Sequence, residues 1–222
     1  MVRDAVDAYA VGLWCADSYW WSSSAGISNV EPDLVVRFSG YLSRDYPRER
    51  LRLRVYEVPG NPPDERVTAL TDRISIRPAS KMKRTAYHLY VNSRPLVRRL
   101  FALRTRLEEI PDRLLPAYLA GRFDGDGNLG ATPRIAYTTE EEARTDQRLL
   151  ARIGVEHTSV LHYARASEYC IYLHVSSVDL FKERVGPHSW KVSRSSCRDC
   201  NGAVPGRENP NLRTAQHAGP GH

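Results

Sequence analysis

The spacing of hydrophobic residues changes several times along the chain and predicts a mixture of helices and strands. Val2, Val6, Tyr9 and Leu13 recur near a 3.6-residue period, which predicts a helix over 2–17. By the same criteria we expect helices at 32–46, 94–109, 140–153 and 178–185, and strands within 19–30, 86–92, 127–138, 155–164 and 168–175.

The clearest strand signal lies at residues 50–56, where arginine and apolar residues alternate strictly. Arg50, Arg52 and Arg54 would share one face of this strand, and the apolar residues between them would face a core. Three like charges in a row repel one another unless water or phosphate lies opposite. The face is therefore either a solvent-facing edge or a surface for a polyanion.

The predicted elements occur in the same order twice: helix, strands, helix, strand, strand, helix. This order predicts an α+β fold with a first half at 1–110 and a second half at 111–192. Residues 57–80 are rich in Pro, Asp and Thr and read as an excursion within the first half, with a short strand near 74–76. Residues 193–222 contain few apolar residues and are predicted to be a disordered tail.

Small residues recur every four positions in two stretches, 8–18 and 117–127, one in each half. In a helix this spacing places them on one face, and a face without bulk lets two backbones approach closely. We expect the two helices to pack together along these faces. The residues are Ala8, Gly12 and Ala16 in the first stretch and Ala117, Gly121 and Gly125 in the second.

Such packing would bring Asp17 and Asp126 side by side at the C-terminal ends of the two helices. Helix dipoles disfavour negative charge there, so two adjacent carboxylates need a cation or a raised pKa. Mg²⁺ prefers one or two carboxylates together with water and phosphate oxygens. The pair therefore predicts a divalent-metal site for a phosphodiester.

Two plainer interpretations of the second stretch exist. One is a helix that ends in an Asp-Gly turn capped by Gly127. The other is an EF-hand loop, because Asp124, Asp126 and Asn128 occupy its first, third and fifth places. The EF-hand pattern then fails, since the sixth place is leucine and the twelfth is isoleucine.

The second stretch, Leu-Ala-Gly-Arg-Phe-Asp-Gly-Asp-Gly at 119–127, resembles the motif of the LAGLIDADG homing endonucleases. The first copy at 10–18 is weaker and has Cys15 for the first motif Asp and Ser18 for the last Gly. The resemblance covers roughly 2–192. It implies two pseudo-symmetric αββαββα halves packed on two central motif helices, with antiparallel saddle sheets for DNA.

The resemblance also implies site residues and a cofactor. Asp17 and Asp126 would bind Mg²⁺ or another divalent cation, with the carbonyls of Ala16 and Gly125 as further ligands. Polar or basic residues would surround the scissile phosphates. The matching positions here are Asn29, Thr138 and Lys191. No lysine occupies the place in the first half that corresponds to Lys191, so the two half-sites are expected to differ.

The charge distribution agrees with a nucleic-acid partner. The net charge is +6, and residues 37–113 hold 18 Lys and Arg against 9 Asp and Glu, whereas residues 114–192 are near neutral. A solvated charged face is the alternative. Side chains expected to contact DNA are Arg50, Arg52, Arg54, Lys81, Lys83, Arg84, His88, Arg134, Tyr172 and His174.

Taken together, the sequence predicts a monomeric, metal-dependent endonuclease for long, imperfectly palindromic double-stranded DNA sites. A DNA-binding regulator or an RNA-splicing maturase without cleavage is the alternative.

No apolar run approaches the length of about 20 residues that spans a membrane, and no secretion signal is visible, so we expect an intracellular, cytoplasmic protein. Cys197 and Cys200 have zinc-knuckle spacing without a nearby second pair.

Overall fold

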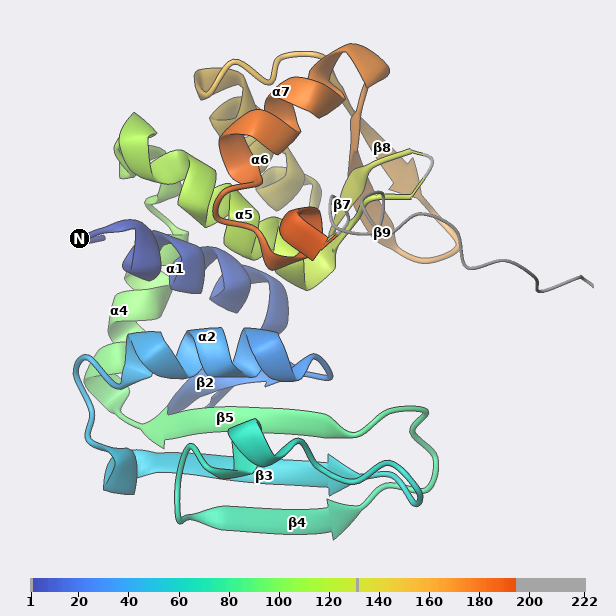
Figure 1. Ribbon diagram of the computed structural model, residues 1–222. Helices are drawn as coiled ribbons and strands as arrows, with labels where there is room; N and C mark the ends of the chain where they lie inside the picture. The colour runs from blue at the N-terminus through green and yellow to red at the C-terminus, as the bar shows by residue number, and fades with distance from the viewer. Residues whose placement is uncertain (1, 131, 195–222) are drawn as a thin grey trace, which may run out of the picture.

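The computed structural model describes residues 2–130 and 132–194 of the 222-residue chain. Two helices, α1 (Ala5–Asp17) and α5 (Leu115–Asp126), lie side by side at the centre (Figure 1). Each leads at its C-terminal end into a β-sheet, and the other helices pack on the sheets and on the central pair. The predicted α+β class and the pairing of the motif helices are confirmed.

The first sheet spans residues 18–92 and has the strand order β1-β2-β5-β3-β4. Its inner face is covered by α2, which lies between the sheet and α1 (Figure 1). The strands are β1 (Ser18–Trp21), β2 (Ser24–Asn29), β3 (Leu51–Glu57), β4 (Ile74–Pro78) and β5 (Ala86–Asn92). The helical segments are α2 (Pro32–Leu42), η1 (Arg48–Arg50), α3 (Glu65–Thr68) and α4 (Arg94–Arg104).

One strand pair in this sheet departs from the expected antiparallel arrangement. The excursion at 57–80 does hold a short strand, β4, but β4 runs parallel to β3, with Leu53 opposite Ile74 and Val55 opposite Ile76. Parallel neighbours need a crossover, and the loop with α3 provides it. The other strand pairs among the described residues are antiparallel, as predicted.

The second sheet spans residues 127–173 and has the strand order β6-β7-β9-β8. It repeats the first without the excursion, so the second half has the predicted αββαββα order. Its strands are β6 (Gly127–Asn128), β7 (Arg134–Tyr137), β8 (Thr158–Tyr163) and β9 (Glu168–Leu173). Its helices are α6 (Glu140–Arg152) and α7 (Val175–Val185), and the connection from the first half contains η2 (Leu107–Glu109) and η3 (Asp112–Leu114).

Strand β3 confirms the alternation that was predicted for it, with one correction. Leu51, Leu53 and Val55 are buried, whereas Arg52 and Arg54 remain partly exposed on the opposite face. Arg50 does not continue this pattern. It belongs to η1, where its guanidinium donates to the carbonyl oxygen of Asn92 at 3.1 Å and lies over the ring of Tyr46.

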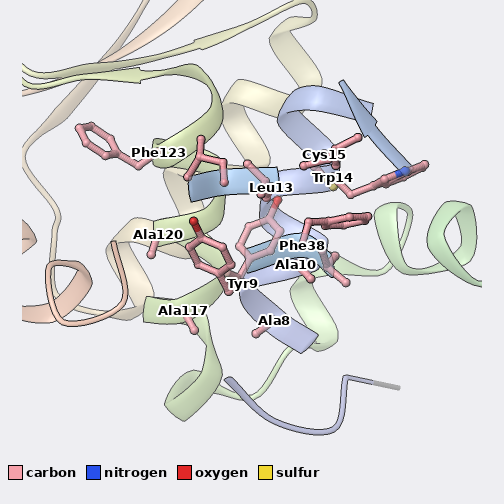
Figure 2. Packing of buried hydrophobic residues seen from close by; sticks show 14 of the residues in the cluster. Ala8, Tyr9, Ala10, Leu13, Trp14, Cys15, Phe38, Ala117, Ala120 and Phe123 are labelled. Atoms are coloured by element: carbon pink, nitrogen blue, oxygen red, sulfur yellow. The ribbon is translucent and has the colours of Figure 1, made fainter. Parts of the chain in front are cut away.

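The core is centred on the contact between α1 and α5, which are buried on nearly every side. A Cβ placed on Gly12 would lie 1.9 Å from the carbonyl oxygen of Tyr118, and one on Gly121 would lie 2.0 Å from that of Tyr9. Figure 2 shows Ala8 and Ala117 on the two facing helices. The two backbones therefore touch directly along the small-residue faces, as the sequence predicts.

Three further predictions meet different outcomes. Among the described residues, no helix is both long and apolar enough to cross a bilayer. The described part of the chain ends at residue 194. Most of the tail predicted at 193–222, including Cys197 and Cys200, therefore lies outside it. The boundary between the halves at residue 110 stays a prediction.

Gly121→Ala is expected to destabilise the protein by about 3 kcal/mol or more, because the added methyl group meets backbone atoms of α1 that cannot move alone. The measurement is the midpoint of urea unfolding. Gly12→Ala, on the facing helix, should have an effect of similar size.

Gly40→Ala is the matched control, since Gly40 is also a helical glycine but has nothing within 4 Å of the added methyl group. It should raise stability by about 0.5–1 kcal/mol, because alanine loses less backbone entropy than glycine in a helix. If Gly121→Ala matched Gly40→Ala, the helices would not approach as closely as described.

Candidate functional site

Asp17 and Asp126 are the last residues of α1 and α5, and both carboxylates lie where these two helices meet. Oδ2 of Asp17 is 2.9 Å from the position that a Cβ on Gly125 would take. Burial raises the pKa of Asp17 to about 6, with a further contribution from the negative charge of Asp126. Burial also raises the pKa of Asp126. The site thus holds two carboxylates that favour a cation.

Asn29, at the end of β2, fixes the orientation of Asp17. Its Nδ2 donates to Oδ2 of Asp17 at 2.7 Å, and its Oδ1 accepts from the backbone N–H of Glu31 at 2.7 Å. Both halves of the amide are thereby engaged, so the side chain has one fixed orientation. The structure places Asn29 beside the carboxylates, as expected for a residue of the site.

Thr138, the counterpart of Asn29 109 residues later, takes a different partner. Its hydroxyl donates to Oε2 of Glu142 at 3.3 Å, and Glu142 in turn accepts from Nε of Arg104 at 3.0 Å. The structure therefore joins Thr138 to an ion pair at the start of α6 and not to Asp126. The two predicted polar residues of the site are not equivalent.

Lys191 reaches the C-terminal end of α5 from a helical turn at 190–194. Its Nζ donates to the carbonyl oxygens of Gly127 at 2.8 Å, Gly125 at 3.0 Å and Phe123 at 3.3 Å. A cation is favourable at a helix C-terminus. Burial lowers the pKa of Lys191, while the nearby carboxylates oppose this shift. The structure thus brings Lys191 to the site.

The two residues whose carbonyl groups are predicted to bind metal, Ala16 and Gly125, lie against each other. The carbonyl oxygen of Gly125 already accepts the hydrogen bond from Lys191, which leaves one lone pair for another partner. Ala16 packs directly against Gly125, with its Cβ 2.3 Å from the position of an added Cβ there. A cation bound through the Gly125 carbonyl would therefore lie next to the lysine ammonium.

Asp124 holds the chain segment that carries Lys191, a role that the sequence did not indicate. Its buried carboxylate accepts from the hydroxyls of Tyr9 at 2.7 Å and Ser189 at 2.5 Å. It also accepts from the backbone N–H groups of Trp190 at 2.7 Å and Lys191 at 3.0 Å. A carboxylate at this position caps the first turn of the helical segment. The first Asp of the motif was the available signal.

Arg122 is the second residue that sequence reasoning missed. It is only 2% exposed, and its Nη1 lies 3.6 Å from Oδ2 of Asp126 while its Nε lies 3.3 Å from Oδ2 of Asp146. Asp146 also accepts from the hydroxyls of Tyr118 at 2.9 Å and Tyr137 at 3.0 Å. An arginine inside an otherwise apolar motif helix was the signal, because a buried charge requires partners.

The outward face of the first sheet carries the predicted basic side chains. Arg52 lies opposite Tyr90, and Arg54 lies opposite His88 in the β3–β5 register. His88 is half-buried between the rings of Tyr19 and Tyr56, with centroids at 5.0 and 4.9 Å, and burial lowers its pKa. The remaining predicted residues of this half lie in the exposed turn between β4 and β5: Lys81, Lys83 and Arg84, the last paired with Glu31 at 2.7 Å.

On the second sheet, two predicted residues form a direct pair. Nη1 of Arg134 donates to the hydroxyl of Tyr172 at 3.0 Å across β7 and β9. His174 lies beyond the end of β9, where it precedes α7 and makes a 2.7 Å hydrogen bond with Ser159. The expectation that His174 continues the strand is wrong, because the helix begins at the next residue.

A cleft of about 500 Å³ connects Asp17 with residues on the outward face of the first sheet. Asp17 and Lys191 line one end of it. Tyr56 and His88 line the other, with Asn29 between them. A ligand that follows the sheet would therefore reach Asp17 and Lys191 directly.

Comparisons with known proteins identify the fold. No protein-family model and no curated protein matches the chain. The solved structure of the homing endonuclease I-DmoI superimposes with a TM-score of 0.60 and 14% identity over 82% of this chain and 95% of its own. The homing endonuclease I-WcaI, bound to its DNA recognition sequence, has a TM-score of 0.55 and 12% identity over 85% of this chain and 84% of its own. The chain has the fold of the LAGLIDADG homing endonucleases.

The resemblance noted in the sequence is thereby confirmed for the fold. Full-length DUF199/WhiA from Thermatoga maritima also superimposes, with a TM-score of 0.52 and 14% identity over 91% of this chain and 62% of its own. Two of these three proteins are endonucleases by name and the third is not. The activity of this chain therefore has to be argued from its own residues.

The donor set of the site fits a divalent cation that is shared with a phosphate. Among residues 2–130 and 132–194, no cluster of three or more His, Cys, Asp or Glu side chains is suitable for a metal. Asp17 and Asp126 provide two carboxylates on neighbouring helix ends. Mg²⁺ commonly binds through one or two carboxylates and completes its shell with water and substrate phosphate oxygens.

Asp17→Asn is expected to raise the stability of the metal-free protein at neutral pH. The pKa of Asp17 is about 6 in the folded protein and about 3.9 in an unfolded chain, so the folded state binds the proton more tightly. The charged carboxylate therefore lowers stability above about pH 6, and this cost disappears as the pH falls toward 4. The variant should gain about 1–3 kcal/mol at neutral pH and nothing near pH 4.

The measurement is thermal unfolding from about pH 4 to pH 8 in the presence of a chelator. The asparagine retains an oxygen that accepts the hydrogen bond from Asn29, so packing is preserved. Asp72→Asn, at an exposed carboxylate paired with Arg48, is the control and should show a much smaller change. A loss of stability in Asp17→Asn at neutral pH would instead identify Asp17 as a helix cap.

Proposed function

We propose that the protein is a metal-dependent endonuclease that hydrolyses phosphodiester bonds in double-stranded DNA. The observation that carries this proposal is the meeting of Asp17 and Asp126 at the ends of two touching helices, with the ammonium group of Lys191 beside them. The cleft that leads from Asp17 and Lys191 to His88, which lies opposite Arg54 on the first sheet, gives a polyanion a continuous path.

The comparisons support the same class of activity. I-DmoI has been solved with DNA and Mn and with DNA and Ca, a variant of I-DmoI with its target DNA and Mg, and I-WcaI with its DNA recognition sequence. Both proteins combine this fold with DNA, and I-DmoI combines it with divalent metals as well. The same fold, together with the carboxylate pair of this chain, favours the same partners here.

In the proposed reaction, each group of the site has a task. Asp17 and Asp126, one from each half, would each hold divalent metal in its own half-site, and the bound metal would activate water and neutralise charge on the phosphate. Asn29 keeps Asp17 in one orientation through its 2.7 Å hydrogen bond. Lys191 offers a positive charge to a non-bridging phosphate oxygen, and Asp124 keeps the backbone of Lys191 in place.

The finer features of the function belong to the proposal as well. Mg²⁺ is the preferred cation because the donors are carboxylates and phosphate oxygens. Both halves lie in one chain, so a monomer with internal pseudo-two-fold symmetry would bind a long, imperfectly palindromic site. Base contacts would come from the sheet faces and phosphate contacts from the flanks. A cytoplasmic location remains part of this proposal.

A non-cleaving regulator or RNA-splicing maturase is the second candidate. Two positively charged side chains of the protein favour this candidate, because they already contact groups predicted to bind the metal. Nζ of Lys191 donates to the Gly125 carbonyl oxygen, and Arg122 lies 3.6 Å from Asp126. Incubation with a randomised duplex library and Mg²⁺ separates the two. Cleaved products support the endonuclease, whereas retention of particular sequences without cleavage supports the regulator.

Asp17→Asn and Asp126→Asn are each expected to lower the cleavage rate at least about 100-fold while DNA binding is kept or becomes tighter. Each removes a metal ligand and also a negative charge that repels the phosphate backbone. Cleavage and DNA affinity are measured on the same samples, the affinity in Ca²⁺ to prevent hydrolysis. Asp72→Asn should leave both unchanged. Full cleavage by either variant would remove that aspartate from the site.

Replacing Arg52 and Arg54 together by alanine should weaken DNA binding and reduce the slope of log affinity against log salt concentration by about 2, because each phosphate contact contributes roughly 0.9. The measurement is a titration of duplex DNA at several salt concentrations. The control pair, Arg98 and Arg184 to alanine, removes the same charge from exposed positions on α4 and α7. An equal loss in both pairs would show that net charge alone determines binding.

A further inference from the structure

Arg122 places a full positive charge in contact with one aspartate of the site, whereas it acts on the other only at longer range. Its Nη1 lies 3.6 Å from Oδ2 of Asp126, four residues further along α5. The position that corresponds to it in the first half, 109 residues earlier, is Leu13, which is fully buried and apolar. Asp17 is instead approached by the neutral amide of Asn29 at 2.7 Å.

The surroundings of Arg122 keep its charge in place. Asp146, from α6, lies 3.3 Å from Nε, and the ring of Tyr137 lies 4.6 Å below the guanidinium carbon. An arginine buried among such groups remains charged, because a carboxylate and an aromatic face both stabilise the cation. Burial also prevents the side chain from swinging into solvent, so the charge stays next to Asp126.

The hydrogen-bonding capacity of this guanidinium is not fully used within the described residues. Both oxygens of Asp146 accept from tyrosine hydroxyls, Oδ1 from Tyr118 and Oδ2 from Tyr137. Nε and Nη1 of Arg122 are buried and have no well-aligned acceptor in the described part of the chain. Nη1 therefore faces Asp126 as a donor without a complete partner, which adds to its attraction for that carboxylate.

A divalent cation at Asp126 would have to share the carboxylate with this resident charge. The side chain of Asp126 is 33% exposed, so a cation reaches it from solvent while Arg122 contacts it from the protein interior. Two cations on one carboxylate repel each other, and the repulsion is strong in a partly buried site. Asp17 has no cation in such contact: its hydrogen-bond partner Asn29 is neutral, and the charge of Lys191 acts on both carboxylates.

We propose that Arg122 is a built-in competitor for divalent metal at Asp126. The half-site of Asp126 therefore binds metal more weakly than that of Asp17, and the two DNA strands are cut in sequence, the strand next to Asp17 first. The ordering of the strands rests on the proposed endonuclease function. The difference in metal affinity does not, and it is measured without DNA.

The first test measures Mn²⁺ binding to the protein without DNA. The readout is the decrease of the EPR signal of free Mn²⁺. The test variant combines Arg122→Leu with Asp146→Asn, which removes both buried charges together and keeps an oxygen for the tyrosine hydroxyls. The matched control is Asp146→Asn alone. The test variant should bind Mn²⁺ about tenfold more tightly than the control. Addition of Asp126→Asn should abolish this gain.

Equal Mn²⁺ affinity in the test variant and the control would overturn the proposal. If neither Asp17→Asn nor Asp126→Asn changed the Mn²⁺ affinity, the result would contradict the proposed function, because the two aspartates would then not bind the metal. Circular dichroism and thermal unfolding report whether each variant is folded before the comparison is made.

The second test uses the unmodified protein and an intact duplex that it cleaves. The duplex is labelled on one strand in one experiment and on the other strand in the next. The Mg²⁺ concentration for half-maximal cleavage should be about tenfold higher for one strand than for the other, and nicked duplex should accumulate when Mg²⁺ is limiting. Equal Mg²⁺ dependence of the two strands would overturn the proposal even if the test variant failed to fold.

Discussion

The direct contact between the backbones of α1 and α5 determines the rest of the structure. Gly12 and Gly121 leave no room for a methyl group, so the two helices run at the shortest separation that backbones allow. This separation places the last turns of the helices together, and with them Asp17 and Asp126. Burial of both carboxylates follows and raises both pKa values, and the charge of Asp126 raises that of Asp17 further. A bulkier interface would separate the carboxylates and, with them, the two neighbouring half-sites that they define.

Much of this arrangement could be predicted from the sequence, because it depends on local periodicity. The alternation in β3 and the four-residue spacing of small residues each report one face of one element. The direction of β4 could not be predicted, since its partner is set by a crossover and not by its own five residues. Arg50 was misplaced because a short helical segment interrupts the alternation just before β3. The pairing of Arg122 with Asp146 depends on α6 packing against α5, which no local pattern encodes.

The two halves share a backbone plan but neutralise their buried charge differently. Tyr9 and Tyr118 occupy matching positions, and each donates its hydroxyl to a buried carboxylate. Tyr9 on α1 donates to Asp124 on the facing motif helix α5, whereas Tyr118 on α5 donates to Asp146 on α6. The position that corresponds to Asp124 is Cys15, whose thiol remains neutral because burial raises its pKa to about 12. The negative charge near Tyr118 therefore comes from α6, where Arg122 accompanies it.

This exchange also accounts for the single lysine of the site. Asp124 accepts two backbone N–H groups of the segment that carries Lys191, and a carboxylate is the acceptor that such a helix start requires. A neutral thiol at Cys15 is a weak acceptor and does not provide an equivalent cap for the chain that follows α4. The cysteine in the first motif thus removes one positioned cation, while Asp146 and Arg122 introduce another beside Asp126. The asymmetry of the site therefore originates in the corresponding buried residues Cys15 and Asp124. The aspartates proposed to bind metal, Asp17 and Asp126, are present in both halves.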